Sequence, residues 1–85
     1  WNDEGLKALS ARVVRAAPNG QAANVMRAVV LSGLCDAWSV GPRSAAEFNE
    51  AATHYDQAAA LSRAPAVKAD NASFAVACHR LVDAM

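Results

Sequence analysis

The sequence predicts an all-α protein, an antiparallel helix-turn-helix array of about four helices. Alanine, the residue that most favours helix, makes up about a quarter of the chain. Apolar residues recur at helical spacing in four segments, and Gly, Pro and Asn residues that favour turns separate these segments. A length of 85 residues allows one domain, residues 1–85, with a small core.

The first two helices are expected at residues 3–17 and 20–38. Asn2 or Asp3 can cap the first helix, because both side chains accept hydrogen bonds from the free amides at a helix start. The second segment is apolar on nearly every side, which is typical of a helix surrounded by other helices. Gly33 lies inside this segment and indicates either the close approach of a neighbouring helix or a local kink.

The last two helices are expected at residues 44–63 and 66–84, after a short connection at residues 39–43. Ser44 and Glu47 fit a capping box, in which a hydroxyl and a carboxylate satisfy two free amides. Mostly small or apolar residues then line one stripe of each helix, which predicts one buried face per helix. The stripe of the third helix is Phe48, Ala51, Ala52, Tyr55, Ala58, Ala59 and Ser62, and that of the fourth is Val67, Asn71, Phe74, Ala75, Cys78, Leu81, Val82 and Met85.

One spacing occurs twice in the chain: an alanine stands seven residues before a proline at the end of an apolar-periodic run. Ala11 precedes Pro18 in the first run, and Ala58 precedes Pro65 in the second, 47 residues later. In both runs an arginine lies just ahead of the proline, which cannot continue a helix. A weak repeat at this period indicates stacked helix pairs, an architecture whose usual role is to bind proteins.

The third segment resembles the second helix of a tetratricopeptide repeat, a helix-turn-helix unit. Ala51, Tyr55 and Ala58 match that family's alanine, aromatic residue and alanine at offsets of four and three, and Gly33 resembles the small residue where the paired helices cross. The resemblance covers mainly residues 25–65, and the 47-residue period is nearer to that of HEAT or armadillo units. It implies a tetratricopeptide-like array that acts as a protein-binding scaffold.

The charges of the chain balance: eight basic and eight acidic residues give a sequence pI near 6.9. This balance offers no basic face for nucleic acid or anionic lipid, and a net charge near zero favours association. No apolar run approaches the roughly 18 residues of a membrane span. We therefore expect a soluble or peripheral chain that binds protein as part of a larger assembly.

No catalytic, cofactor or metal site is expected. His79 adjoins Cys78, but no second Cys or His lies three or four positions away to complete a metal-binding pair. The capping box explains Glu47, the serines lack the context of a nucleophile elbow, and the glycines form no phosphate-binding loop. Cys35 and Cys78 could form a disulfide, although buried thiols are the simpler interpretation.

The leading functional interpretation is a non-enzymatic protein-protein interaction or scaffold module. Alanine side chains bury little apolar surface, so we expect the helices to gain stability against neighbouring repeats or another subunit. The alternatives are a small peripheral subunit that stabilises or links chains of a larger, organellar membrane-associated complex, and a helical subdomain of an enzyme. The chain lacks an initiator methionine, which favours a mature or trimmed piece of a longer product, and the compartment, cytoplasmic or organellar, stays open. The large side chains expected at packing or contact positions are Trp1, Trp38, Phe48, Tyr55, Phe74 and Met85.

Overall fold

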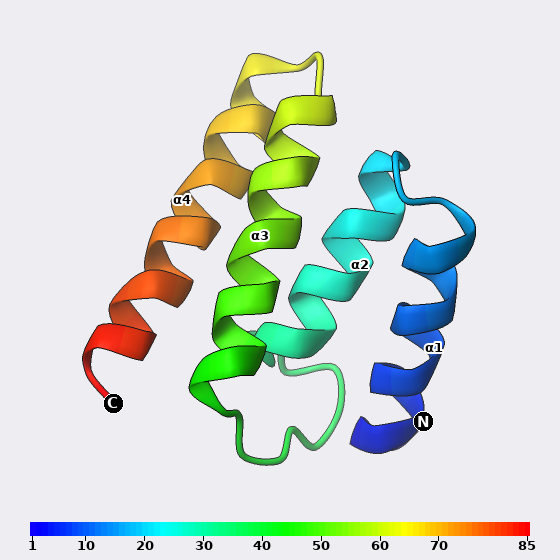
Figure 1. The fold of residues 1–85 in the computed structure, drawn as a ribbon, viewed down its shortest axis with the longest axis vertical. Helices are drawn as coiled ribbons and strands as arrows, with labels where there is room; N and C mark the ends of the chain where they lie inside the picture. The colour runs from blue at the N-terminus through cyan, green and yellow to red at the C-terminus, as the bar shows by residue number, and fades with distance from the viewer.

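Four helices and no strand make up this protein, whose computed structural model describes residues 1–85 (Figure 1). The prediction of an all-α fold with about four helices is therefore confirmed. Each helix begins within one residue of its predicted start. The helices are α1 (Asp3–Ala16), α2 (Gln21–Ser32), α3 (Ala45–Leu61) and α4 (Pro65–Asp83).

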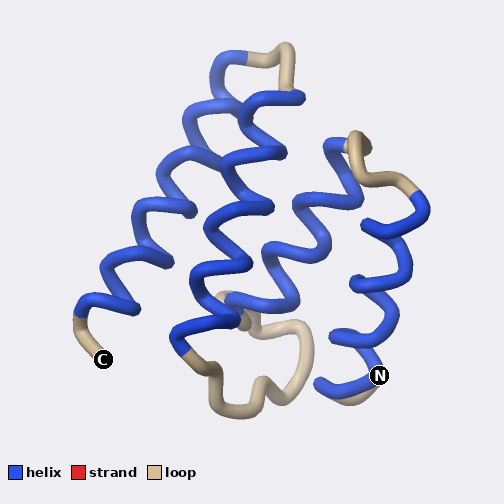
Figure 2. The backbone as a smooth tube through the Cα atoms, viewed as in Figure 1, coloured by secondary structure: helices blue, strands red, loops and turns tan.

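The helices stand side by side in chain order, and each packs antiparallel against the next (Figure 1). The connections at residues 17–20 and 62–64 lie at one end of this row, and the loop at residues 33–44 lies at the other end with both termini (Figure 2). The molecule measures 32 × 31 × 20 Å. Because the row does not close on itself, α1 and α4 form its two outer edges.

Side chains near the helix starts satisfy backbone amides that would otherwise lack a partner. The Asn2 carboxamide oxygen accepts a hydrogen bond of 2.7 Å from the amide of Gly5 at the start of α1. The capping box at the start of α3 is confirmed, because Ser44 Oγ accepts from the Glu47 amide at 3.1 Å and Glu47 Oε1 accepts from the Ser44 amide at 3.0 Å. Pro65 is the first residue of α4, where a missing amide hydrogen costs nothing.

The second helix is shorter than the sequence predicts: α2 ends at Ser32 rather than at residue 38. Gly33 follows it in the left-handed conformation, with φ at 64°, and donates its amide hydrogen to the carbonyl of Val29. Gly33 is therefore the residue that ends the helix, and the expectation of a helix crossing or kink at this position is wrong. The loop that follows spans residues 33–44 instead of the predicted 39–43.

The two prolines of the repeated spacing occupy different places. Pro18 lies in the turn that follows α1, whereas α3 already ends at Leu61 and Pro65 begins α4. Ala64 is extended, with φ at −84° and ψ at 118°, because the residue before a proline is disfavoured in the helical region. The prediction that Pro65 itself stops the third helix is therefore wrong.

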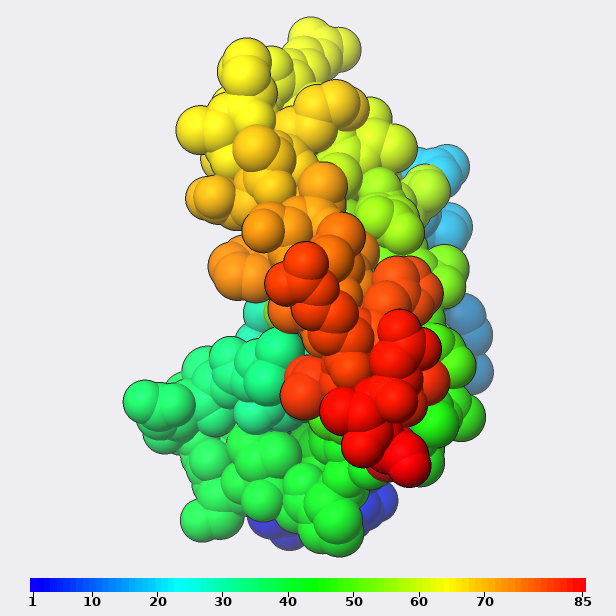
Figure 3. All heavy atoms as spheres, turned by 90° about the vertical axis from the view of Figure 1, so that its left-hand side faces the viewer, coloured from blue at the N-terminus to red at the C-terminus, as the bar shows by residue number.

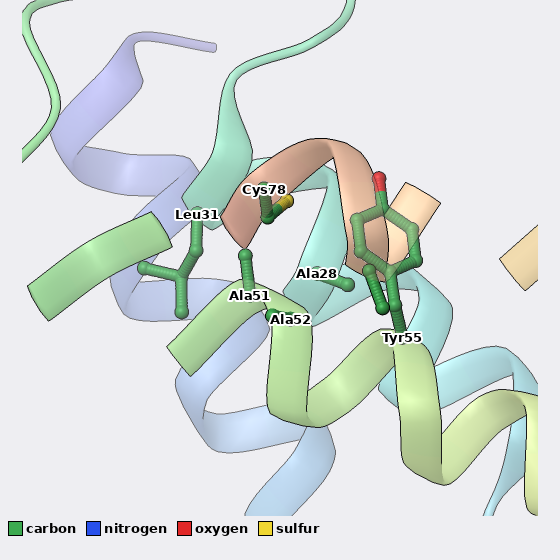
Figure 4. Close-up of a cluster of buried hydrophobic side chains, with 7 residues drawn as sticks. Ala28, Leu31, Ala51, Ala52, Tyr55 and Cys78 are labelled. Atoms are coloured by element: carbon green, nitrogen blue, oxygen red, sulfur yellow. The ribbon is translucent and has the colours of Figure 1, made fainter. Parts of the chain in front are cut away.

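Small side chains form most of the interior. One cluster of seven buried residues lies where α3 meets α2 and α4, and four of its members are alanine (Figure 4). Because an alanine methyl buries little surface, close approach of the backbones replaces the large interlocking side chains of an ordinary core. The cluster contains Ala28, Leu31, Ala51, Ala52, Tyr55, Ala75 and Cys78.

Candidate protein-contact surface

A cluster of polar contacts, which we call the Asp3 clasp, fastens the long loop to the start of α1. It consists of Asp3, Trp38, Gly41 and Arg43. The Arg43 guanidinium donates to both carboxylate oxygens of Asp3, at 2.6 and 2.7 Å. The Trp38 indole donates to Asp3 Oδ1 at 2.7 Å, and the Gly41 amide donates to Asp3 Oδ2 at 3.2 Å. The carboxylate thus holds three points of the loop.

Arg43 also completes the end of α2. Its Nε donates to the carbonyl of Leu31 and its Nη2 donates to the carbonyl of Val30, each at 2.9 Å. These carbonyls have no partner within the helix, and a cation at a helix C-terminus also meets the negative end of the helix dipole. The hydrogen bonds from Arg43 and Trp38 hold the pKa of Asp3 well below its ordinary value of 3.8.

One ion pair and one hydrogen bond join α1 to the middle of the row, and a second ion pair joins α2 to α3. The Arg27 guanidinium on α2 donates to the carbonyl of Lys7 at 2.8 Å, and it pairs with Glu50 on α3 at 3.2 Å. Lys7 in turn reaches Glu47 on α3 at 2.7 Å. The hydrogen bond between Lys7 and Glu47 raises the pKa of the lysine and lowers that of the glutamate. These polar contacts therefore hold α1 against α2 and α3.

A buried asparagine anchors the turn between α1 and α2. The Asn24 amide donates to the carbonyls of Pro18 and Gly20, and its oxygen lies 2.8 Å from Nδ1 of His54. His54 is thus explained by its contact with Asn24. No cluster of three or more His, Cys, Asp or Glu residues could hold a metal ion.

The opposite side of the row, where α3 meets α4, is mainly apolar. The Tyr55 hydroxyl lies 3.4 Å from Ser32 Oγ, and the Tyr55 ring lies 5.4 Å from the Phe74 ring at a tilted angle of 46°. Burial raises the pKa of the Tyr55 phenol and that of the Cys78 thiol. Phe74 itself remains half-exposed.

Three large apolar side chains on one side of α4 face solvent, and we call them, together with Met85 two residues past the end of the helix, the α4 stripe: Val67, Phe74, Leu81 and Met85. Their exposed fractions are 40%, 48%, 37% and 67%. Val76 is also exposed, on another side of α4. Val67, Phe74 and Leu81 recur every seven residues, so they lie within about 40° of one another around the helix. Figure 3 looks onto α4, and no other segment lies across it. The α4 stripe is therefore a row of exposed apolar side chains, spaced about 10 Å apart along the helix.

The structure separates the aromatic candidates named from the sequence. Tyr55 is buried, Phe48 is half-buried, and the half-buried Trp38 belongs to the Asp3 clasp. Trp1 is 84% exposed at the start of α1, at the edge of the row opposite α4. Phe74 lies with Met85 in the α4 stripe.

The predicted buried face of the fourth helix is divided in the structure. Asn71, Ala75 and Cys78 are buried, whereas the four residues of the α4 stripe lie beside them in solvent. The face predicted from the sequence is thus wider than the one that α3 covers. The heptad spacing of Val67, Phe74 and Leu81 was the signal that could have marked a second face.

The cysteines and the shape of the surface indicate no further functional site. Cys78 is buried, Cys35 is half-buried, and both thiols are free. The molecule contains no detectable pocket. None of the four helices combines the length and the apolar character that a membrane span needs.

No protein family, curated protein or solved structure matches this chain.

Proposed function

We propose that this chain is a non-enzymatic protein-binding module of helical-repeat type that contacts its partner through the α4 stripe. The observation that carries the proposal is the stripe itself, because large apolar side chains that are exposed along one side of a helix are typical of protein-protein contact sites. A partner that packs against these side chains would remove their apolar surface from water, and this burial would stabilise the complex.

The other outer helix provides the contrast. The outward positions of α1 are Glu4, Ala8, Arg12 and Arg15, all exposed, and three of the four are charged. Such a face is well solvated and gains little from a partner. Trp1 is a large exposed apolar side chain at this edge too, but it stands alone before α1. Exposed large apolar residues recur along the helix only on α4.

A photo-crosslinking residue placed on α4 tests this proposal. Benzoylphenylalanine in place of Phe74 is expected to form protein adducts when the chain is expressed in cells and irradiated. Val76 is the matched control position, because its exposed fraction of 49% equals that of Phe74 within one per cent. Val76 lies about 160° away around the helix. Equal adduct formation from both positions, or none from Phe74, would contradict the proposal.

The same experiment separates the alternative role of a small structural subunit that links chains of a larger complex. A permanent subunit is expected to give one adduct of fixed mass at near-complete yield, since an obligate interface is always occupied. A binding module gives adducts whose yield follows the concentration of the partner.

A further inference from the structure

We propose that α1 and residues 36–42 of the long loop, which we call the strap, open from the rest of the molecule as one unit, so that the strap is released when α1 leaves α2 and α3. This conformational device lies at the α1 edge of the row and does not depend on the function proposed for the α4 stripe. Its basis is that one side chain, Asp3 at the first position of α1, holds both parts together (Figure 2).

The strap has almost no other attachment. Five of its seven residues are exposed and none is buried. The two half-buried ones, Trp38 and Gly41, are the two that donate to Asp3, at 2.7 and 3.2 Å. The strap makes no backbone-to-backbone hydrogen bond, and its other hydrogen bonds run from Arg43 to the carbonyls of Gly41 and Pro42. Neither a buried residue nor a hydrogen bond therefore ties the strap to α2, α3 or α4.

α1 is also held at few points. Ser10 is its only buried residue. Apart from those of Asp3, its polar contacts with other helices are the ion pair of Lys7 with Glu47 and the hydrogen bonds of Arg27 to the Lys7 carbonyl and to Ser10 Oγ. A helix with so little buried surface is expected to open more easily than a central helix such as α3.

The coupling follows from the shared carboxylate. Departure of α1 and departure of the strap each break the same hydrogen bonds at Asp3, so the two openings together take less free energy than the sum of the two alone. If the strap leaves first, α1 keeps its contacts through Lys7 and Arg27. If α1 leaves first, the strap keeps only its neighbour Arg43. The release of α1 therefore releases the strap.

Native-state hydrogen exchange followed by NMR measures this coupling in the natural chain. The indole N–H of Trp38 and the amide of Gly41 report on the strap, because both are hydrogen-bonded to Asp3. We expect their protection factors to agree within about threefold with those of the slowest amides of α1, and to fall along the same curve as urea is added. Loss of protection at Trp38 and Gly41 before α1 would overturn the inference, since the strap would then open without α1.

Arg27→Met tests the coupling from the side of α1. Arg27 is bound to α1 and α3 and makes no hydrogen bond with the strap. We expect the variant to lower protection in α1 and at Trp38 and Gly41 by the same factor, about tenfold. Lys68→Met is the matched control, because it also removes a cation that donates to a backbone carbonyl, that of Ala59, but at the α4 edge. It is expected to leave protection in α1 and the strap unchanged.

Trp38→Phe tests the coupling from the side of the strap. It removes one hydrogen bond to Asp3 and keeps an aromatic ring. Because coupling between two sites is reciprocal, we expect the protection of the α1 amides to fall about tenfold. Trp1→Phe is the control, since it makes the same change at a side chain that is exposed at the start of α1. It is expected to leave α1 unchanged.

The inference fails if Arg27→Met lowers protection in α1 but not in the strap, or if Trp38→Phe leaves α1 unchanged. It also fails if Lys68→Met lowers protection in both parts as strongly as Arg27→Met, since the whole molecule would then open at once. The urea series on the natural chain decides the question if a variant does not fold. The α4 stripe is tested separately by crosslinking at Phe74, so either proposal can fail without the other.

Discussion

Asp3 shows how much one side chain contributes at the residue scale. It receives hydrogen bonds from an indole, a backbone amide and a guanidinium, all from a loop that lies 35 to 40 residues further along the chain. The same guanidinium satisfies the carbonyls of Val30 and Leu31 at the end of α2. One ion pair therefore fixes the loop and completes a helix.

The stability of the protein is expected to depend on pH through this residue. Because folding lowers the pKa of Asp3, the unfolded chain binds more protons than the folded chain at acid pH, and the free energy of unfolding rises with pH there. The stabilisation is fully present above the ordinary pKa of 3.8 and is lost as the pH falls through the lower folded value.

Urea unfolding between about pH 2 and pH 6 measures this dependence. Asp3→Asn is expected to lower stability at pH 6 and to flatten the curve at its acid end. Asp56→Asn is the control, since this exposed carboxylate has no ion pair. An unchanged slope in Asp3→Asn would show that the clasp does not form in solution.

Gly33 is a second position where one residue decides local structure. Its φ of 64° is strained for any residue with a Cβ atom, and a Cβ at this position would lie 2.5 Å from Cγ1 of Val40. We expect Gly33→Ala to lower the free energy of unfolding by about 1 to 3 kcal/mol. Gly33→Asn is expected to cost less, because asparagine tolerates the left-handed region better. Chemical denaturation compares the two, and equal stability of Gly33→Ala and the natural chain would contradict the assignment.

At the scale of the element, the close packing of α3 against its neighbours depends on its small alanine side chains. Ala51, Ala52 and Ala58 are fully buried, so the neighbouring helices lie close to its backbone. We expect Ala51→Leu to lower the free energy of unfolding by about 1 to 3 kcal/mol, because the added atoms have no free volume to occupy.

The exposed Ala60 on the same helix is the matched control for this overpacking. Ala60→Leu makes the same chemical change in the same element, and we expect an effect within about 0.5 kcal/mol. Thermal or urea unfolding measures both variants. Equal effects at Ala51 and Ala60 would show that α3 is not closely covered.

Across the whole molecule, the open row predicts an uneven distribution of stability. α3 packs against helices on both sides and has five buried residues, whereas α1 packs at one edge and has one, Ser10. The amides of α1 are therefore expected to exchange with solvent through a partial opening that leaves α3 closed.

Native-state hydrogen exchange measured residue by residue tests this difference. The opening free energy in α1 is expected to lie below that in α3, and Arg27→Met, which removes the bridge from α2 to α1 and α3, is expected to widen the gap. Equal opening free energies in both helices would show that the row unfolds only as a unit.

The resemblance to tetratricopeptide repeats stays a prediction at this scale. The row of antiparallel helices is compatible with it, but Gly33 does not lie at a helix crossing, and the two prolines of the repeated spacing serve different helices. A repeat architecture would place equivalent residues at equivalent points of each helix pair, and these positions do not do so.

The sequence by itself determined the number of helices and where each begins. Helix starts depend on local groups, such as the Asn2 cap, the Ser44 and Glu47 box and Pro65, which act within one turn of the chain. Apolar spacing likewise identified the buried stripe of α3, because Ala51, Tyr55 and Ala58 face the same direction in any α-helix.

Only the tertiary structure decided which apolar residues of α4 are covered and how the long loop is held. Helical spacing shows that residues share a side, but the width of the buried face depends on how much of it the neighbouring helix reaches. The pairing of Asp3 with Arg43 joins residues 40 positions apart, and local propensities carry no information about a contact at that separation. The end of α2 belongs with these features, since apolar residues continue past Gly33 and the left-handed turn is stabilised by a side chain from the far end of the loop.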